Sequence, residues 1–120
     1  MKSLDAIAED FYHAFYNKEW LGDASSVRKL SIAEAYQVQD LVLKKRQEKG
    51  ERVVGFKVGC TSNAIRKQFG INEPINGRLF QPHIMDSKAT IDYNNYVNCA
   101  IEPEMVFKIG LMNIQAAVKS

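Results

Sequence analysis

The apolar pattern of the chain changes its period at residues 50–59, which read Gly50-Glu51-Arg52-Val53-Val54-Gly55-Phe56-Lys57-Val58-Gly59. From Val54 onward the apolar side chains recur at every second residue, which is the period of a β-strand. We expect Val54, Phe56 and Val58 to face the core together, with Lys57 on the opposite face. A strand is therefore predicted over residues 53–59.

Two helices are predicted before this strand. Over residues 4–16 the apolar residues recur at helical spacing, at Leu4, Ile7, Ala8, Phe11 and Phe15. Residues 22–26 have the composition of a turn and are expected to form a loop. Ser31 and Glu34 form a capping box at the start of a second helix, for which Gly50 is a suitable end.

A β-rich half is predicted after the strand. Thr61 or Ser62 caps a short helix that runs to about Phe69, and Gly70 ends it. Pro74 and the Asn76-Gly77 pair indicate a turn, and short strands are expected at residues 78–80, 89–93 and 99–109. Two helices followed by strands favour an α+β class over a βαβ alternation. We interpret residues 1–120 as one domain, helical over 1–50 and β-rich over 51–110.

The composition is that of an ordinary globular protein. The apolar fraction is 46%, the charged fraction is 25% and the net charge is +2. The basic residues are scattered, so neither a nucleic-acid nor a membrane partner is expected. Cys60 and Cys99 form no disulfide framework and no metal-site spacing. The N-terminus does not read as a signal peptide, so we expect a cytoplasmic protein with reduced thiols.

Lys57 is the first candidate for chemistry. It shares its face of the predicted strand with Gly55 and Gly59, and glycine in a strand often marks a close approach by a ligand. A lysine with open space around it can donate a proton to an anionic substrate or pair with its charge. The alternative is an ordinary exposed lysine on an edge strand.

Glu102 and Glu104 are the second candidate. In an extended segment they project to the same face, where two carboxylates repel each other unless a cation, a proton or a lysine lies between them. Mg²⁺ commonly binds through one or two carboxylates. Pro103 places the segment at an edge, a strand start or a bulge. The alternative is a solvated strand face.

Thr61 and Ser62 open the short helix directly after the Lys57 strand. Free backbone N–H groups at a helix start favour anions, so the two residues are candidates for binding a substrate carboxylate. Helix capping alone explains them equally well. His13 and His83 are isolated in the sequence and are interpreted as surface residues.

Four segments together resemble the 2-keto-4-pentenoate hydratase family in their order and spacing. They are residues 35–39 (Ala35-Tyr36-Gln37-Val38-Gln39), residues 50–62, residues 73–79 (Glu73-Pro74-Ile75-Asn76-Gly77-Arg78-Leu79) and residues 101–107 (Ile101-Glu102-Pro103-Glu104-Met105-Val106-Phe107). The family shares its fold with fumarylacetoacetate hydrolase and includes the related 4-oxalocrotonate decarboxylases.

The resemblance implies helices beside part of a mixed β-roll or sandwich. It implies that Glu102 and Glu104 bind Mg²⁺ or Mn²⁺ and that Lys57 is the active-site lysine. The reaction would be hydration of a 2-hydroxy-2,4-dienoate in the catabolism of aromatic compounds. No acidic residue stands at Ile75, where some hydratases have one, and this keeps 4-oxalocrotonate-type decarboxylation open.

The resemblance covers the N-terminal half of the family only. The family's third metal-binding carboxylate lies beyond residues 101–107, and residues 111–120 are atypical of the family. We therefore expect a truncated domain, and an inactive homologue is the third alternative. Unpaired strand edges would make such a domain associate with itself as a homo-oligomer, or with a partner.

Overall fold

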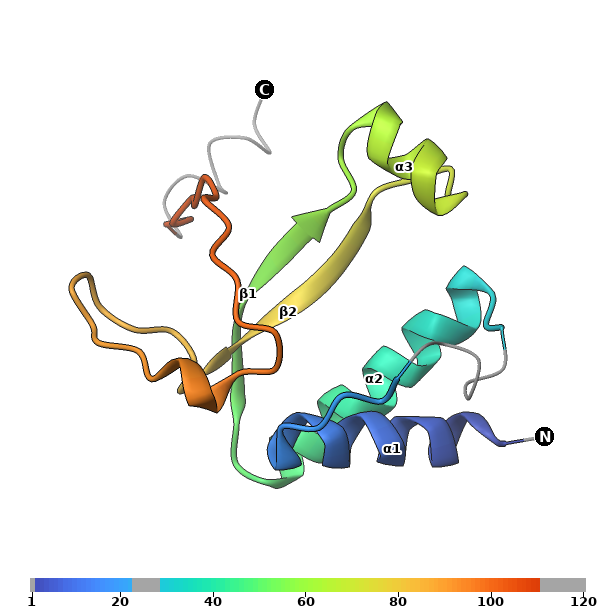
Figure 1. Ribbon diagram of the computed structural model, residues 1–120, viewed down its shortest axis with the longest axis horizontal. Helices are drawn as coiled ribbons and strands as arrows, with labels where there is room; N and C mark the ends of the chain where they lie inside the picture. Colours follow the sequence, from blue (N-terminus) through green and yellow to red (C-terminus); the bar gives the residue numbers. More distant parts are fainter. Residues whose placement is uncertain (1, 23–28, 111–120) are drawn as a thin grey trace.

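The computed structural model describes residues 2–22 and 29–110 of the chain. Two long helices pack side by side along one side of a two-stranded antiparallel sheet, and a short helix lies at one end of the sheet (Figure 1). The elements, in chain order, are α1 (Leu4–Asn17), α2 (Ile32–Glu48), β1 (Arg52–Gly59), α3 (Asn63–Phe69), β2 (Ile75–Gln81) and the 3₁₀ turn η2 (Tyr93–Asn95). The α+β class is confirmed as helices with a small antiparallel sheet.

The helix boundaries follow local hydrogen bonding. Ser31 accepts from the backbone N–H of Glu34, and the Glu34 carboxylate accepts from the backbone N–H of Ser31, so the predicted capping box is formed. The Ser62 hydroxyl caps α3 by accepting from the backbone N–H of Ile65, and Gly70 ends that helix in the left-handed region at φ 66°. Gly22 is described, whereas the rest of the predicted 22–26 loop and the predicted tail at 111–120 lie outside the described residues.

The main apolar core lies between α1 and α2. Ile7 and Ala8 are fully buried against Val38, and Leu4, Leu30, Leu41 and Val42 pack around them. Phe11 and Phe15, which were predicted to continue the buried stripe of α1, are 42% and 46% exposed. No helix in the described parts of the chain is both long and apolar enough to cross a membrane.

The pairing of β1 with β2 corrects two predictions. Asn76 and Gly77 lie within β2, opposite Val58 and Lys57, and not in a turn. Val54, Phe56 and Val58 are 45–68% exposed and do not face the core. The partly buried positions of β1 are Val53, Gly55 and Gly59. The alternation was predicted correctly, but tertiary packing decided which of the two faces is covered.

Two predicted strands are not formed. Residues 89–93 and 99–109 have no regular secondary structure apart from the beginning of η2. A strand needs a neighbour for its backbone N–H and C=O groups, and the only ladder among residues 2–22 and 29–110 joins β1 to β2. The structure thus contains two of the strands expected of a larger β-roll.

Replacement of Ser31 by alanine tests the capping box. Ser31→Ala removes the side-chain acceptor at the start of α2, and we expect the free energy of unfolding to fall by about 1 kcal/mol. Urea denaturation followed by far-ultraviolet circular dichroism measures the change. Ser87→Ala, in an exposed loop, is the matched control, and an equal loss in both variants would contradict the capping role.

Candidate functional site

Lys57 lies near the end of β1, directly opposite Gly77 of β2. A Cβ atom added to Gly77 would have no neighbour within 4 Å, whereas one added to Gly55 would meet Leu79 Cδ1 at 3.3 Å. The open space beside Lys57 is therefore due to Gly77. The sequence argument attributed the open space to Gly55 and Gly59, but Leu79 fills the space at Gly55, and a Cβ added to Gly59 would contact Ile75 Cγ1 at 3.6 Å.

The structure brings the three predicted chemical residues together. Lys57 Nζ lies 3.2 Å from Glu102 Oε2 and 3.9 Å from Glu104 Oε1, although the carboxylates lie more than forty residues further along the chain. All three side chains are about half exposed or more. We call Lys57, Glu102 and Glu104 the carboxylate–lysine cluster. Two negative charges and one positive charge leave the cluster with a net charge of −1.

The two carboxylates meet one requirement of a divalent-metal site. They lie near a single ammonium group, and their oxygens are the hard donors that Mg²⁺ and Mn²⁺ prefer. Among the described residues no group of three His, Cys, Asp or Glu side chains is arranged to hold a metal. A cation here would therefore keep waters or substrate oxygens as its other ligands.

Thr61 and Ser62 have local partners. The Ser62 hydroxyl accepts from the backbone N–H of Ile65, and the Thr61 carbonyl accepts from the guanidinium of Arg66 at 2.5 Å. The capping role of Ser62 is confirmed. Binding of a substrate by either residue stays a prediction.

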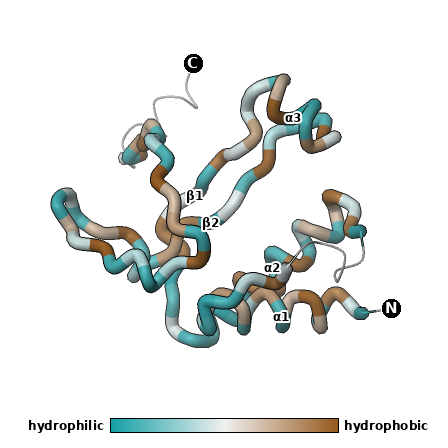
Figure 2. Tube along the Cα trace, viewed as in Figure 1, coloured by the Kyte–Doolittle hydropathy of each residue, from teal (hydrophilic) through white to brown (hydrophobic). Residues whose placement is uncertain are grey.

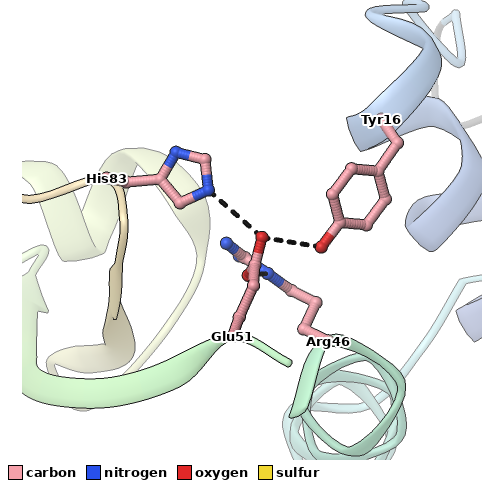
Figure 3. A network of polar contacts seen from close by, with 4 residues as sticks. All are labelled: Tyr16, Arg46, Glu51 and His83. Atoms are coloured by element: carbon pink, nitrogen blue, oxygen red, sulfur yellow. Dashed lines mark hydrogen bonds and ion pairs between the residues drawn. The ribbon is translucent and has the colours of Figure 1, made fainter. Parts of the chain in front are cut away.

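A second polar cluster was missed by the sequence analysis and is centred on Glu51 (Figure 3). Its Oε1 accepts from the hydroxyl of Tyr16 at 2.7 Å and lies 3.3 Å from Nε2 of His83, while its Oε2 accepts from Nε of Arg46 at 2.5 Å. The Glu51 network, as we name these four residues, joins the end of α1, the end of α2, the start of β1 and the segment after β2. His83 was interpreted as an isolated surface residue, and its sequence position gave no signal of this contact.

Burial and hydrogen bonding shift two pKa values in the Glu51 network. Burial raises the pKa of Tyr16 to about 12, and its hydrogen bond to the Glu51 carboxylate adds to the rise. Burial also acts to raise the pKa of Glu51, but the hydrogen bonds from Tyr16, Arg46 and His83 outweigh it and hold that pKa below its ordinary value. Glu51 is therefore ionised and Tyr16 neutral at pH 7.

The contents of the Glu51 network point to a structural role. The side chains of Glu51 and Arg46 are only 10% and 13% exposed, and the Arg46 guanidinium stacks 3.6 Å from the ring centre of Phe80. A largely enclosed ion pair of this kind organises the elements that supply it. A separate open hollow beside α3 is lined by Asn63, Arg66, Lys67, Gly70, Ile71 and Asn72, and it contains no member of either cluster.

Comparison with known proteins identifies the lineage. No family model matches the chain. A 4-oxalocrotonate decarboxylase of a Pseudomonas species is 36% identical over 81 residues, which are 68% of this chain and 32% of that protein. A 2-keto-4-pentenoate hydratase of Paraburkholderia xenovorans is 32% identical over 81 residues, covering 68% of this chain and 30% of the relative. This chain is a partial homologue of the hydratases and decarboxylases.

Solved structures agree with this partial homology. The 4-oxalocrotonate decarboxylase of Pseudomonas putida, complexed with calcium and acetate, superposes with a TM-score of 0.60 at 32% identity. The same enzyme complexed with magnesium and adipate gives 0.59. Each superposition covers 64% of this chain and 30% of the decarboxylase. The chain spans about a third of the length of the relatives it matches, and the family resemblance predicted from the sequence is confirmed to that extent.

The stability of this partial homologue should depend on pH through the Glu51 network. Because folding lowers the pKa of Glu51 below 4.5, its contribution is complete above that pH and is lost as the pH falls through the folded value. Because folding raises the pKa of Tyr16 from 10.0 to about 12, its contribution is lost as the pH rises through that range. We expect Glu51→Gln to lower the free energy of unfolding at pH 7 by roughly 2–3 kcal/mol, because Arg46 loses its partner.

Urea denaturation at pH 7 and at pH 3.5 measures this difference, which should shrink at the lower pH. Glu9→Gln is the matched control, because Glu9 also pairs with basic residues, Lys45 and His13, but its side chain is 45% exposed. Its loss should stay below about 1 kcal/mol. Equal losses from the two variants would show that the Glu51 network has no special structural role.

Proposed function

We propose that the chain binds a divalent cation, Mg²⁺ or Mn²⁺, at Glu102 and Glu104 and acts with Lys57 on a small 2-keto acid. One observation carries this proposal. The three side chains come together from segments far apart in a chain that is homologous to enzymes of this class. The decarboxylase that superposes on it is known in complex with magnesium.

The net charge of −1 supports binding of a further cation at the two carboxylates. The carboxylates are exposed enough to exchange water for a metal, and Lys57 holds them only through an exposed ion pair of small energy, about 0.2–1 kcal/mol. When bound, the metal would supply electrostatic stabilisation of the enolate-like charge on the 2-keto oxygen. With Glu102 holding a metal, the Lys57 ammonium would be available to pair with the substrate.

The roles of the chain's own residues follow from this arrangement. Lys57 pairs with the substrate carboxylate or donates a proton, and the gap at Gly77 gives a substrate access to its ammonium group. Glu102 and Glu104 orient the cation. The net reaction we favour adds water across the conjugated system of a 2-hydroxy-2,4-dienoate and yields a 4-hydroxy-2-keto acid.

A second candidate reaction is decarboxylation of a 2-keto dioate such as 4-oxalocrotonate. It is supported by the 36% identity to a decarboxylase. It is also supported by Ile75, an apolar residue at a position where some hydratases have an acidic residue. The same carboxylate–lysine cluster would serve, because the charge that develops on loss of CO₂ is also enolate-like. The two reactions differ in their products, so one assay series separates them.

Metal binding is the first prediction of the proposal. Isothermal titration calorimetry with Mn²⁺ should show one site per chain, and Glu102→Gln or Glu104→Gln should weaken it at least tenfold by removing a ligand. Lys57→Met should strengthen it by about 2- to 5-fold, because the competing ammonium group is gone. Glu73→Gln, an exposed residue outside the cluster, is the control. Unchanged affinity in all three cluster variants would exclude the site.

Turnover is the second prediction. The chain with Mg²⁺ or Mn²⁺ should consume 2-hydroxypenta-2,4-dienoate, followed by loss of the dienol's ultraviolet absorbance, and a chelator should stop it. Lys57→Met should lower the rate by about 100-fold or more while metal binding persists. Release of CO₂ from 4-oxalocrotonate without hydration of the dienoate would establish the decarboxylase. Metal binding with neither reaction would leave a cation-binding homologue and refute the catalytic proposal.

A further inference from the structure

One edge of β2 is bound by side chains of α2. In the described part of the chain β1 and β2 are the only strands, so the edge of β2 away from β1 has no strand beside it. At this edge the Tyr36 hydroxyl accepts from the backbone N–H of Asn76 at 3.1 Å, and Gln39 Nε2 donates to the Asn76 carbonyl at 2.9 Å. Residues three apart on a helix lie on the same face. Two α2 side chains therefore occupy both backbone groups of one β2 residue, as a neighbouring strand would.

The side chain of Asn76 is held as well. Its Nδ2 donates to the Tyr36 hydroxyl at 3.3 Å, and its Oδ1 accepts from Nη1 of Arg78 at 2.7 Å. Every polar group of Asn76 thus has a partner, although the residue itself is exposed. We call Tyr36, Gln39 and Asn76 the α2–β2 clamp.

β2 contacts α2 at a second point, where the Arg46 guanidinium lies 3.6 Å from the ring centre of Phe80. Phe80 follows Asn76 by four residues, which is about 13 Å along a strand. Arg46 follows Gln39 by seven residues and Tyr36 by ten, which is about 10–15 Å along a helix. The two distances match, so α2 and β2 lie side by side with both contacts in place (Figure 1). A shift of β2 by one residue, about 3.3 Å, would break both contacts.

Apolar packing does little to fix the position of β2. Phe80 is the only residue of β2 that is buried, and the main core between the helices contains no residue of this strand. In Figure 2 hydrophobic stretches lie along the paired helices, whereas the colour along β2 changes between hydrophobic and hydrophilic. Register is weakly specified in a strand that has little buried surface on either face. The register of β2 therefore depends on the α2–β2 clamp and on Phe80.

The observed register is the one that leaves space beside Lys57. The residue opposite Lys57 is Gly77, and directly opposite residues lie within about 5 Å of each other. A shift of β2 by one or two residues in either direction would put one of four other residues there, namely Ile75, Asn76, Arg78 or Leu79. Each of these has a side chain that would fill the space, and Arg78 would also add a second positive charge.

We propose that Tyr36 and Gln39 are positioning residues for Lys57, because they hold β2 in the register that places Gly77 opposite it. The value of the open space to a substrate rests on the proposed function, whereas the register itself involves neither metal nor turnover. A failed metal-binding or activity assay would therefore count against the proposed function and leave the register to its own measurement.

Nuclear magnetic resonance of the full chain measures the register directly. Both backbone groups of Asn76 face α2, so Asn76 and Val58 form a non-hydrogen-bonded pair with Cα atoms about 4.5 Å apart. The α-protons of this pair should give a strong nuclear Overhauser effect in the unmodified chain. Its absence there would overturn the proposal.

The double variant Tyr36→Phe/Gln39→Met removes the hydrogen bonds to the backbone of Asn76 and nearly keeps both side-chain volumes. We expect the effect between Asn76 and Val58 to fall by more than half. New backbone effects should then pair Lys57 with a β2 residue that carries a side chain, because the strand slips. Circular dichroism checks that the variant retains its helices.

Tyr93→Phe/Gln37→Met changes the same residue types at exposed positions and is the matched control. It should leave the pairing of β1 with β2 unchanged. An unchanged pairing in the clamp variant as well would overturn the proposal. So would a loss of the pairing without a new partner for Lys57, because the clamp would then only hold β2 against the helix.

A disulfide test provides a second readout and serves if the double variant does not fold. With both native cysteines replaced by serine, Phe56→Cys and Arg78→Cys occupy a directly opposite pair two residues along the ladder, where a disulfide fits. The milder change Tyr36→Phe should lower the effective concentration of the two thiols by about fivefold or more, because slipped registers separate them. An effective concentration as high as that with Tyr93→Phe would overturn the proposal.

Discussion

The fold depends on the Glu51 carboxylate more than on any other single group. Its two oxygens receive the Tyr16 hydroxyl, the Arg46 guanidinium and the His83 ring. These partners come from α1, α2 and the segment after β2, so one side chain at the start of β1 holds the helices and the sheet together. The rest of the core is small, with Ile7 and Ala8 the only described residues that are fully buried. The Glu51 network therefore supplies part of the stabilisation that apolar packing provides in larger domains.

The two polar clusters differ in role: the Glu51 network stabilises the fold, and the carboxylate–lysine cluster is the candidate for chemistry. Within the Glu51 network the side chains of Glu51 and Arg46 are only 10% and 13% exposed, and both oxygens of Glu51 have partners, so this carboxylate has little capacity to bind a ligand. The carboxylate–lysine cluster is exposed, carries a net charge of −1 and has open space at Gly77. Groups that are exposed and incompletely neutralised are those that a cation or substrate can reach. Between them runs β1, with Glu51 just before its start and Lys57 near its end, so the network positions the strand that presents the lysine.

The sequence predicted the local elements well because their causes are local. Ser31 and Glu34 form hydrogen bonds within one helical turn at the start of α2. Ser62 caps the first turn of α3, and Gly70 ends its last turn. The strand over residues 53–59 was likewise visible in its alternation. The structural predictions failed where the deciding contacts join residues that are far apart in the sequence. The sequence could not tell which face of β1 is covered, that Asn76 and Gly77 continue a strand, or that Phe15 stays exposed.

What the sequence by itself determined was the helices, the strand over residues 53–59, the middle of the strand that contains residues 78–80, the lineage and the identity of Lys57, Glu102 and Glu104 as candidates for chemistry. These follow from spacing and residue type. The tertiary structure alone decided that Gly77 opens the space beside Lys57, that both carboxylates meet its ammonium group, and that His83 reaches Glu51. The reason is physical: strand register and long-range ion pairs depend on which segments the fold brings within a few ångströms, and no local pattern encodes that distance.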